Sequence, residues 1–305
     1  MKRAALFFIV FSFLQFCIMH IEGEGNRDGQ GLRMMTAIPA AYAAEKKEKE
    51  SVYDRVMRTG KIRCGYVVYP PALVMDPNTR VLSGIYPDIL EKVSALLNLD
   101  IEWTEEVSWA TLSEGLLTGR YDLFCSAAWP NGPRSRVVAF SHPLYFSGID
   151  VYLRSDEDRF QSHDDLNRKD LRFSVIDGST IYFMTKEFFP KASLHSLPEM
   201  SSHAEMILDV GLKKADAVLA ERSAAYDFMR HNPDMIKPFE ATVPLVANAN
   251  SFVFDRDQYA FASMINGAVD ILQNQGVINK ILKKYEPADD FFFYRVARPY
   301  AAPGE

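Results

Sequence analysis

Short apolar runs of strand length alternate with stretches of helical periodicity from about residue 60 to residue 285. Strands that alternate with helices favour parallel sheets that are buried on both faces. The sequence therefore predicts an α/β fold. The predicted strands are 62–68, 99–103, 121–126, 171–176 and 215–220.

Apolar residues fall on one helical face over 89–97, 112–117 and 261–272. A capping box formed by Ser202 and Glu205 predicts the start of a further helix. These helices lie between the predicted strands, as the alternation requires.

The chain also contains two segments of similar sequence pattern. Residues 117–124 resemble residues 210–218, since each segment ends a helix, passes a basic turn and enters a strand through an aspartate, Asp122 or Asp216. Two such segments indicate two similar α/β lobes rather than one wide sheet.

The N-terminus has the features of a secretory leader. Lys2 and Arg3 precede an apolar run over 4–19 that is short for a membrane span, and an Ala-x-Ala site ends at Ala43. We expect residues 1–43 to be removed as a signal peptide and the mature protein to be exported. The alternative is an uncleaved N-terminal anchor. The net charge of −6 argues against nucleic acid or an anionic membrane as the main partner.

The segment 119–148 carries the most informative chemistry. An apolar strand ends at small residues that begin with Ser126, and a turn rich in Pro, Asn and Gly leads to a single Arg134. Backbone amides freed at the end of a strand, beside a guanidinium, form a place for a carboxylate.

This segment resembles the ligand-binding turn of family 3 of the bacterial solute-binding proteins, which supply polar amino acids to ABC importers. Arg134 lies six residues before Phe140-Ser141-His142-Pro143-Leu144, as in that family. The resemblance extends from about residue 60 to residue 285. It identifies the chain as a divergent member of a periplasmic, two-lobe (type II) family.

The resemblance implies a domain organisation. Each lobe would hold a mostly parallel sheet flanked by helices, and two hinge strands near 148–153 and 246–252 would join the lobes. The first lobe would be discontinuous, and we expect the C-terminal tail, with its aromatic run, to pack on the surface of a lobe. The predicted parts are lobe 1 at 51–147 plus 250–285, lobe 2 at 148–249, and the tail at 286–305.

The resemblance also assigns candidate ligand-binding residues. Tyr69 takes the place of an aromatic residue that covers the ligand, and Trp109 that of a second aromatic wall. Ser179 and Thr180 match a turn that grips the ligand carboxylate, and Glu221 stands where the family has an Asp that pairs with the ligand ammonium. The plain alternatives are a Pro-stiffened loop at Tyr69, a core tryptophan at Trp109, a helix N-cap at Ser179 or Thr180, and an adjacent arginine that claims Glu221.

The central turn departs from the family. Small hydroxyl residues are usual where this chain has Trp129 and Asn131, although Ser126 and Arg134 fit a carboxylate site. An indole in the cleft and a longer acid at Glu221 put the usual α-amino acid ligand in doubt.

Cys17 would leave with the leader, whereas Cys64 and Cys125 lie in two predicted strands that are neighbours in the family's fold. An exported pair of cysteines invites a disulfide. Because a bridge between adjacent parallel strands is geometrically awkward, we expect two buried free thiols.

No catalytic motif or metal-ligand spacing is found, and no cofactor is expected. The leading hypothesis is a monomeric receptor for a small amino acid or related carboxylate that delivers its ligand to an ABC importer permease. The alternatives are a periplasmic enzyme of the same fold, such as a dehydratase with Glu221 as its acid or base, and a sensory or accessory protein without a transporter.

Overall fold

The computed structural model describes residues 50–239, 244–286 and 292–297. The predicted leader, with its Ala-x-Ala site and Cys17, lies outside the described residues, so its cleavage stays a prediction. In the part of the chain that the structure describes, no helix is long and apolar enough to cross a bilayer. The described residues belong to one compact unit.

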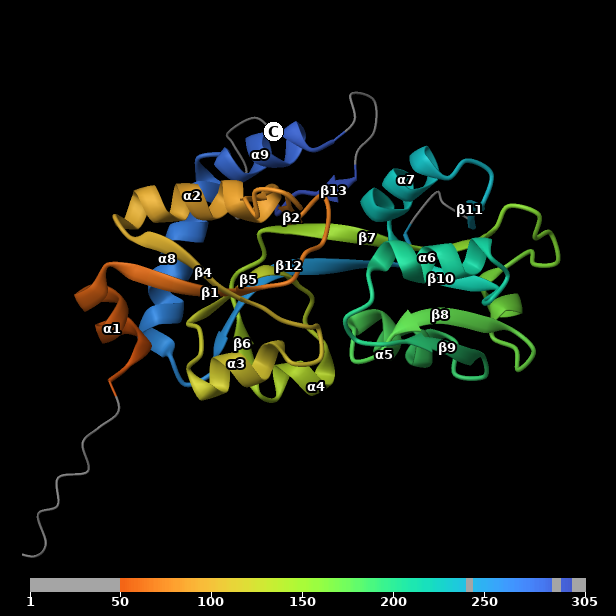
Figure 1. Ribbon diagram of the computed structural model, residues 1–305, viewed down its shortest axis with the longest axis horizontal. Coiled ribbons are helices and arrows are strands. Elements are labelled where there is room, and N and C mark those ends of the chain that lie inside the picture. The colour runs from red at the N-terminus through yellow and green to blue at the C-terminus, as the bar shows by residue number, and fades with distance from the viewer. Residues whose placement is uncertain (1–49, 240–243, 287–291, 298–305) are drawn as a thin grey trace, which may run out of the picture. The chain divides into compact units, whose positions relative to one another are not determined.

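Parallel strands form the centre of the first lobe (Figure 1). Strand β1 (Lys61–Tyr66) pairs in parallel with β4 (Asp100–Glu106) and with β5 (Leu123–Ala128). The other elements of this lobe are α1 (Val52–Thr59), β2 (Val74–Met75), β3 (Leu82–Ser83), α2 (Ile85–Leu97), α3 (Leu112–Thr118), α4 (Gly132–Ser135), β6 (Val138–Phe140), α8 (Tyr259–Asn274) and α9 (Val277–Lys284).

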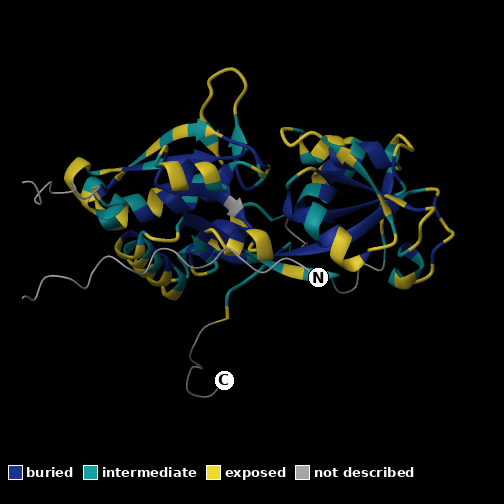
Figure 2. Cartoon of the chain, turned by 90° about the horizontal axis from the view of Figure 1, so that it is seen from below, coloured by how far each residue is buried: buried dark blue, intermediate teal, exposed yellow. Residues whose placement is uncertain are grey.

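Successive residues of these strands enter two different cores, as the period of two in a strand requires. Ile62 and Cys64 join the larger core with side chains of α2, α8 and α9. Phe124 and Val253 join a smaller core with side chains of α3. Both faces of the sheet are therefore covered, and Figure 2 shows buried strands beneath helices that expose their outer faces.

The second lobe repeats this arrangement. Strand β8 (Arg172–Ile176) pairs in parallel with β9 (Ser193–Leu197) and with β10 (Ala217–Glu221). Its side chains form a separate hydrophobic core with those of the helices around it. The other elements are a 3-10 helix (His163–Leu166), α5 (Thr180–Phe188), α6 (His203–Gly211), α7 (Arg222–His231) and β11 (Ile236–Phe239).

Two long antiparallel strands join the lobes. Strand β7 (Tyr145–Arg154) pairs with β12 (Val246–Asp255) from Tyr145 opposite Asn250 to Ile149 opposite Val246. The sheets of both lobes are thus continuous, in the order β4-β1-β5-β12-β7-β10-β8-β9. The prediction of a two-lobe α/β fold with mostly parallel lobe sheets and two hinge strands is confirmed. The residue boundaries of the lobes stay a prediction.

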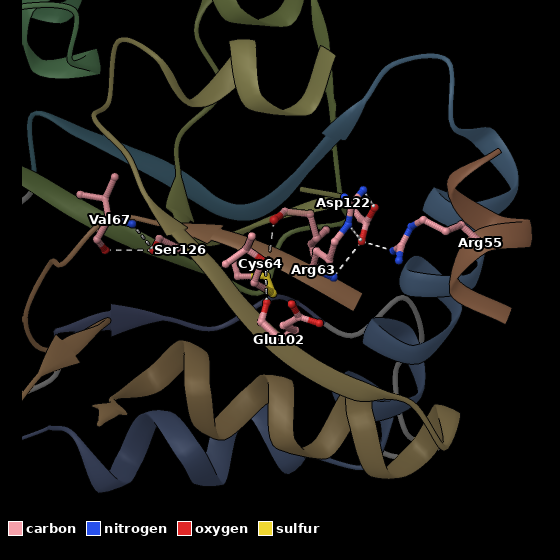
Figure 3. Close-up of a disulfide and its surroundings, with 10 residues drawn as sticks. Arg55, Arg63, Cys64, Val67, Glu102, Asp122 and Ser126 are labelled. Atoms are coloured by element: carbon pink, nitrogen blue, oxygen red, sulfur yellow. Dashed lines mark hydrogen bonds and ion pairs between the residues drawn. A yellow bond between two sulfur atoms is a disulfide. The ribbon is translucent and has the colours of Figure 1, made fainter. Parts of the chain in front are cut away.

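The similarity between segments 117–124 and 210–218 has a structural basis. The Asp122 carboxylate accepts a hydrogen bond from the Arg63 amide at 2.7 Å, and the Asp216 carboxylate accepts one from the Arg172 amide at 2.9 Å. Each aspartate therefore ties the entry of one strand to the strand beside it, β5 to β1 and β10 to β8. Asp122 is also paired with the guanidinium groups of Arg55 and Arg63 (Figure 3).

The expectation of two free thiols is wrong, because Cys64 and Cys125 form a disulfide (Figure 3). Both residues belong to the larger core of the first lobe, so their side chains point to the same face of the sheet. Their Cα atoms are 5.5 Å apart, which is within the range that a disulfide spans. The register of β1 on β5 places Cys64 beside Leu123, so that Cys125 is the next residue of β5 on the same face. The sequence does not give that register.

The C-terminal segment does not simply pack on a lobe surface. Strand β13 (Phe293–Tyr294) pairs with the hinge strand β7 at Ser147 and Phe146. Phe293 is 2 % exposed and lies in the core of the first lobe, where its ring is 5.2 Å from that of Tyr145. The expectation of surface packing is therefore wrong for this residue, because it completes a core and a sheet edge.

Candidate functional site

Turns at the carboxyl ends of parallel strands in both lobes converge on two adjacent cavities. This is where open parallel sheets bind their ligands. The inner cavity has a volume of about 20 Å³, close to that of a single water probe. The outer cavity has a volume of about 350 Å³.

The inner cavity is lined by residues of both lobes, five of which the sequence predicts as site residues. They are far apart along the chain and meet only because the lobes face one another. The lining consists of Tyr69, Trp109, Trp129, Ser179, Thr180, Ile181 and His203.

Arg134 is the buried cation of this site, with 6 % of its surface exposed. Its guanidinium donates to the carbonyl oxygen of Trp109 at 2.8 Å, to that of Trp129 at 3.3 Å and to Thr180 Oγ1 at 3.3 Å. Burial lowers its pKa to about 10. Among the described residues no carboxylate lies within ion-pair distance of Arg134, so its charge is met only by neutral oxygens.

Asn131 and Thr180 connect the lobes beside this arginine. Asn131 Oδ1 caps helix α4 by accepting a hydrogen bond from the Arg134 amide at 2.8 Å, and Asn131 Nδ2 donates to Thr180 Oγ1 at 3.1 Å. The side-chain amide of Asn131 thus caps α4 and bridges the two lobes, at a position where the family usually has a hydroxyl.

Helix α5 presents its N-terminus to the cavity. Ser179 is the N-cap and accepts a hydrogen bond from the Tyr182 amide at 3.2 Å, which is the plain reading of this residue in the sequence. The preceding Gly178 has a φ of +72°, and a Cβ there would lie 2.6 Å from Ala110 Cβ of the first lobe. Only glycine allows both this backbone conformation and this close approach.

Glu221 is the buried anion of the site. It ends strand β10 and is 4 % exposed. The adjacent Arg222 does not claim it, because Arg222 Nε donates to Asp150 Oδ2 at 2.6 Å. Burial raises the pKa of Glu221, while the hydroxyls of Ser147 and Tyr69 partly offset that effect. No basic side chain of the described residues forms an ion pair with Glu221.

Tyr69 lies between Glu221 and the cavities. Its side chain lines both cavities, and burial, followed by the charge of Glu221, raises the pKa of its hydroxyl well above the usual value. The hydroxyl is close enough to stabilise the carboxylate, yet it forms no hydrogen bond of normal geometry with the described residues. Tyr69 therefore keeps a loosely held buried donor beside a buried carboxylate.

The polar groups of Trp129 and Ser126 form hydrogen bonds with other residues of the protein. The Trp129 indole donates from Nε1 to Asn250 Oδ1 at 2.9 Å, while its ring lines the inner cavity. Ser126 Oγ accepts from the Val67 amide at 2.9 Å and donates to the Val67 carbonyl at 3.0 Å (Figure 3). Five predicted residues thus line the inner cavity, Asn131 and Arg134 bond to Thr180 of that lining, and Glu221 lies beside Tyr69. The hydroxyl of Ser126 instead holds β5 to the segment after β1.

His203 also lines the cavities, and sequence reasoning missed it. It is the first residue of α6, directly after the N-cap Ser202. Its ring centroid is 4.4 Å from that of Tyr69 and 6.0 Å from that of Trp109. The sequence fixes its place in the first turn of a helix through the capping box, but nothing local indicates that the ring meets the facing lobe.

Trp129→Thr is expected to widen the inner cavity and to raise the affinity for common polar amino acids such as L-serine and L-glutamine. The loss of a large buried ring should also cost about 3–5 kcal/mol of unfolding free energy. Isothermal titration calorimetry and urea unfolding measure the two effects. Trp129→Phe, which keeps most of the volume, serves as the control. Unchanged affinities in Trp129→Thr would show that the indole does not restrict the ligand.

The described residues include no group of three or more His, Cys, Asp or Glu side chains placed to hold a metal ion. The site instead combines a buried guanidinium, a helix N-terminus, aromatic rings and a buried carboxylate. This arrangement suits a small polar organic ligand.

Two α/β lobes with a polar cleft between them define the class of two-lobe solute-binding proteins. The chain matches the model of the bacterial extracellular solute-binding proteins, family 3, over residues 62–288, and it belongs to that family.

Curated relatives share this family at low identity. The chain is 25% identical over 207 residues to a probable histidine-binding protein of Campylobacter jejuni, covering 67% of this chain and 77% of the relative. It is 22% identical over 232 residues to a probable amino-acid ABC transporter-binding protein of Haemophilus influenzae, covering 75% and 86%.

Solved structures share the fold. An ancestral amino acid-binding protein, described as a precursor of cyclohexadienyl dehydratase, superposes with a TM-score of 0.66 at 24% identity, covering 77% of this chain and 99% of that protein. An amino acid ABC transporter substrate-binding protein of Streptococcus pneumoniae, bound to L-arginine, gives a TM-score of 0.64 at 21% identity, covering 76% and 97%.

Proposed function

We propose that the protein is an exported receptor that closes its lobes on a small zwitterion, an amino acid or a close relative, and delivers it to an ABC importer. One observation carries the proposal. Arg134 and Glu221 are buried and opposite in charge, and neither has an ion-pair partner among the described residues.

A buried charge without a counter-ion costs several kcal/mol, and a partner of opposite charge offsets that cost. A ligand carboxylate would accept from the planar guanidinium of Arg134, which matches the two oxygens of a carboxylate. A ligand ammonium would donate to Glu221 and so replace the neutral partners that this carboxylate now has. Both demands are met by one zwitterion.

The compartment and the partner rest on separate support. A disulfide between Cys64 and Cys125 is typical of an oxidising compartment such as the periplasm. The Haemophilus influenzae relative is named as a transporter-binding protein, which supports a permease as the partner. A sensory protein without a transporter would share the site, and the presence or absence of permease and ATPase genes beside this gene separates the two.

A thermal-shift screen over amino acids, simple amines and small carboxylates, followed by calorimetric titration of the hits, tests the proposal. We expect zwitterions to raise the melting temperature more than either half of the molecule does alone. A ligand that spans both lobes must favour the closed form. Stabilisation by simple amines or by simple carboxylates alone, with no effect of zwitterions, would contradict the proposal.

Glu221→Gln is expected to lower the affinity for amine-bearing ligands about ten- to hundredfold, because a hydrogen bond to a charged group is lost. The affinity for simple carboxylates should not change. Since burial raises the pKa of Glu221, wild-type affinity for amine ligands should fall as the pH drops through that raised pKa. The variant should lack this pH dependence. Titration calorimetry across pH measures both effects. Glu187→Gln, an exposed acid of the same lobe, is the control.

A second candidate function is an enzyme on the same scaffold, favoured by one observation. A carboxyl whose pKa is raised by burial keeps its proton to a higher pH than a free one and can donate it to a bound substrate. Incubation of the protein with each ligand from the screen, followed by mass spectrometry of the products, decides between binding and turnover. Loss of turnover with retained binding in Glu221→Gln would identify this residue as the acid.

A further inference from the structure

The two aromatic walls predicted to enclose the ligand are already covered by a side chain of this protein. The rings of Tyr69 and Trp109 have centroids 6.0 Å apart, and the imidazole of His203 packs against both. Tyr69 and Trp109 belong to the first lobe, whereas His203 belongs to helix α6 of the second. The contact therefore forms across the cleft.

The position of His203 also divides the cleft. His203 lines the inner cavity together with Thr180, which accepts a hydrogen bond from Arg134, and it lines the outer cavity as well. The inner cavity of about 20 Å³ has room for about one water molecule, so a ligand side chain needs space beyond it. A ligand that anchors its carboxylate at Arg134 reaches the outer cavity only when His203 moves.

His203 can move without disturbing the fold around it. The preceding Ser202 caps α6 by accepting a hydrogen bond from the Glu205 amide at 3.2 Å, so the helix start does not depend on the imidazole. Among the described residues, no hydrogen bond or ion pair holds the His203 ring, which packs against the two aromatic rings.

The charges around His203 favour a positively charged ligand side chain. Burial lowers the pKa of His203 to about 4, so the imidazole is neutral at neutral pH and does not repel a positive charge. The charged residues that line the outer cavity are Glu106, Glu199 and Asp227, and the described part of its lining contains no lysine or arginine. A side chain that displaces His203 therefore enters an acidic compartment.

We propose that His203 is a specificity-determining residue of this cleft: its imidazole covers the aromatic walls that a long ligand side chain must occupy, and the ligand has to replace that contact. Short ligands leave this contact in place when the lobes close, because their side chains do not reach the aromatic walls. Long ligands gain affinity only when their own side chain replaces the ring contacts that His203 loses. Planar groups and positively charged groups make such contacts with aromatic faces. The proposal rests on the proposed function, because Arg134 must hold the ligand carboxylate.

His203→Ala tests the proposal with four probes, L-arginine and L-histidine as long ligands and glycine and L-alanine as short ones. Isothermal titration calorimetry should show about two- to tenfold tighter binding of the long probes, which corresponds to the contact of one aromatic pair. The affinities of glycine and L-alanine should not change. His203→Phe, which replaces the imidazole by a larger ring, should bind the long probes more weakly than His203→Ala does. His142→Ala, which removes an exposed imidazole of the first lobe, is the matched control.

Weaker binding of L-arginine and L-histidine by His203→Ala would make the ring a ligand contact and overturn the proposal. Equal changes for long and short probes would also overturn it, as would the absence of any binding by His203→Ala. The same titrations of Arg134→Ala separate this result from the proposed function. If Arg134→Ala abolishes binding while His203→Ala changes nothing, only the inference about His203 fails.

Discussion

Arg134→Ala is expected to weaken ligand binding by about thirtyfold to several-thousandfold. Removing one partner of a desolvated charge pair typically costs about 2–5 kcal/mol, since it leaves the ligand carboxylate buried against neutral groups. Titration calorimetry with the best ligand of the screen measures the loss. Arg136→Ala, which removes an exposed guanidinium two residues further on, should bind normally.

The structure also predicts a cost in stability for this variant. The guanidinium of Arg134 is buried and donates to the carbonyls of Trp109 and Trp129, so the variant also loses these hydrogen bonds. Arg134→Lys keeps the positive charge but lacks the planar fork of donors, so it should recover part of the stability and little of the affinity. Unchanged affinity in both variants would mean that the ligand carboxylate binds elsewhere.

The double variant Cys64→Ala/Cys125→Ala should lose about 4 kcal/mol of unfolding free energy. The disulfide closes a loop with a sequence separation of 61 residues, and chain entropy predicts a stabilisation of this size for such a loop. Urea unfolding under oxidising conditions measures the difference.

A reductant provides the control for this prediction. Dithiothreitol should lower the stability of the wild-type protein toward that of the double variant and should leave the double variant unchanged. A loss below about 1 kcal/mol would show that the bridge adds little to what the core around it already supplies.

Much of the fold follows from the pattern of apolar residues. The predicted strand at 171–176 corresponds to β8 (Arg172–Ile176), and the capping box at Ser202 starts α6, because both depend on local periodicity and local hydrogen bonds. Strand β9 (Ser193–Leu197) was not predicted. It is at best half-buried along its length, so its sequence lacks the continuous apolar run that marks the inner strands.

The disulfide and the C-terminal strand depend on information that no local pattern contains. Whether Cys64 meets Cys125 is decided by the register of two strands, and the pairing of Phe293 with β7 joins segments about 146 residues apart. Such long-range relations are set by tertiary packing, which a single sequence does not display.

The candidate site shows the same division. Motif spacing pointed to Arg134, Thr180 and Glu221. In the structure Arg134 donates to Thr180 and Glu221 lies beside Tyr69, and their role in binding is still to be tested. His203 could not be singled out, because a histidine in the first turn of a helix has no meaning until the facing lobe brings Tyr69 against it.

The pairing of β13 with β7 has a consequence for work with shortened chains. The family match ends at residue 288, before β13 begins, whereas β7 is paired at Phe146 and Ser147 with β12 on one side and with β13 on the other. A chain cut at the family boundary would expose unpaired backbone groups of β7 together with the apolar site that Phe293 fills. Exposed strand edges recruit other chains. Such a shortened protein should therefore self-associate and precipitate, and the extra segment keeps the molecules apart.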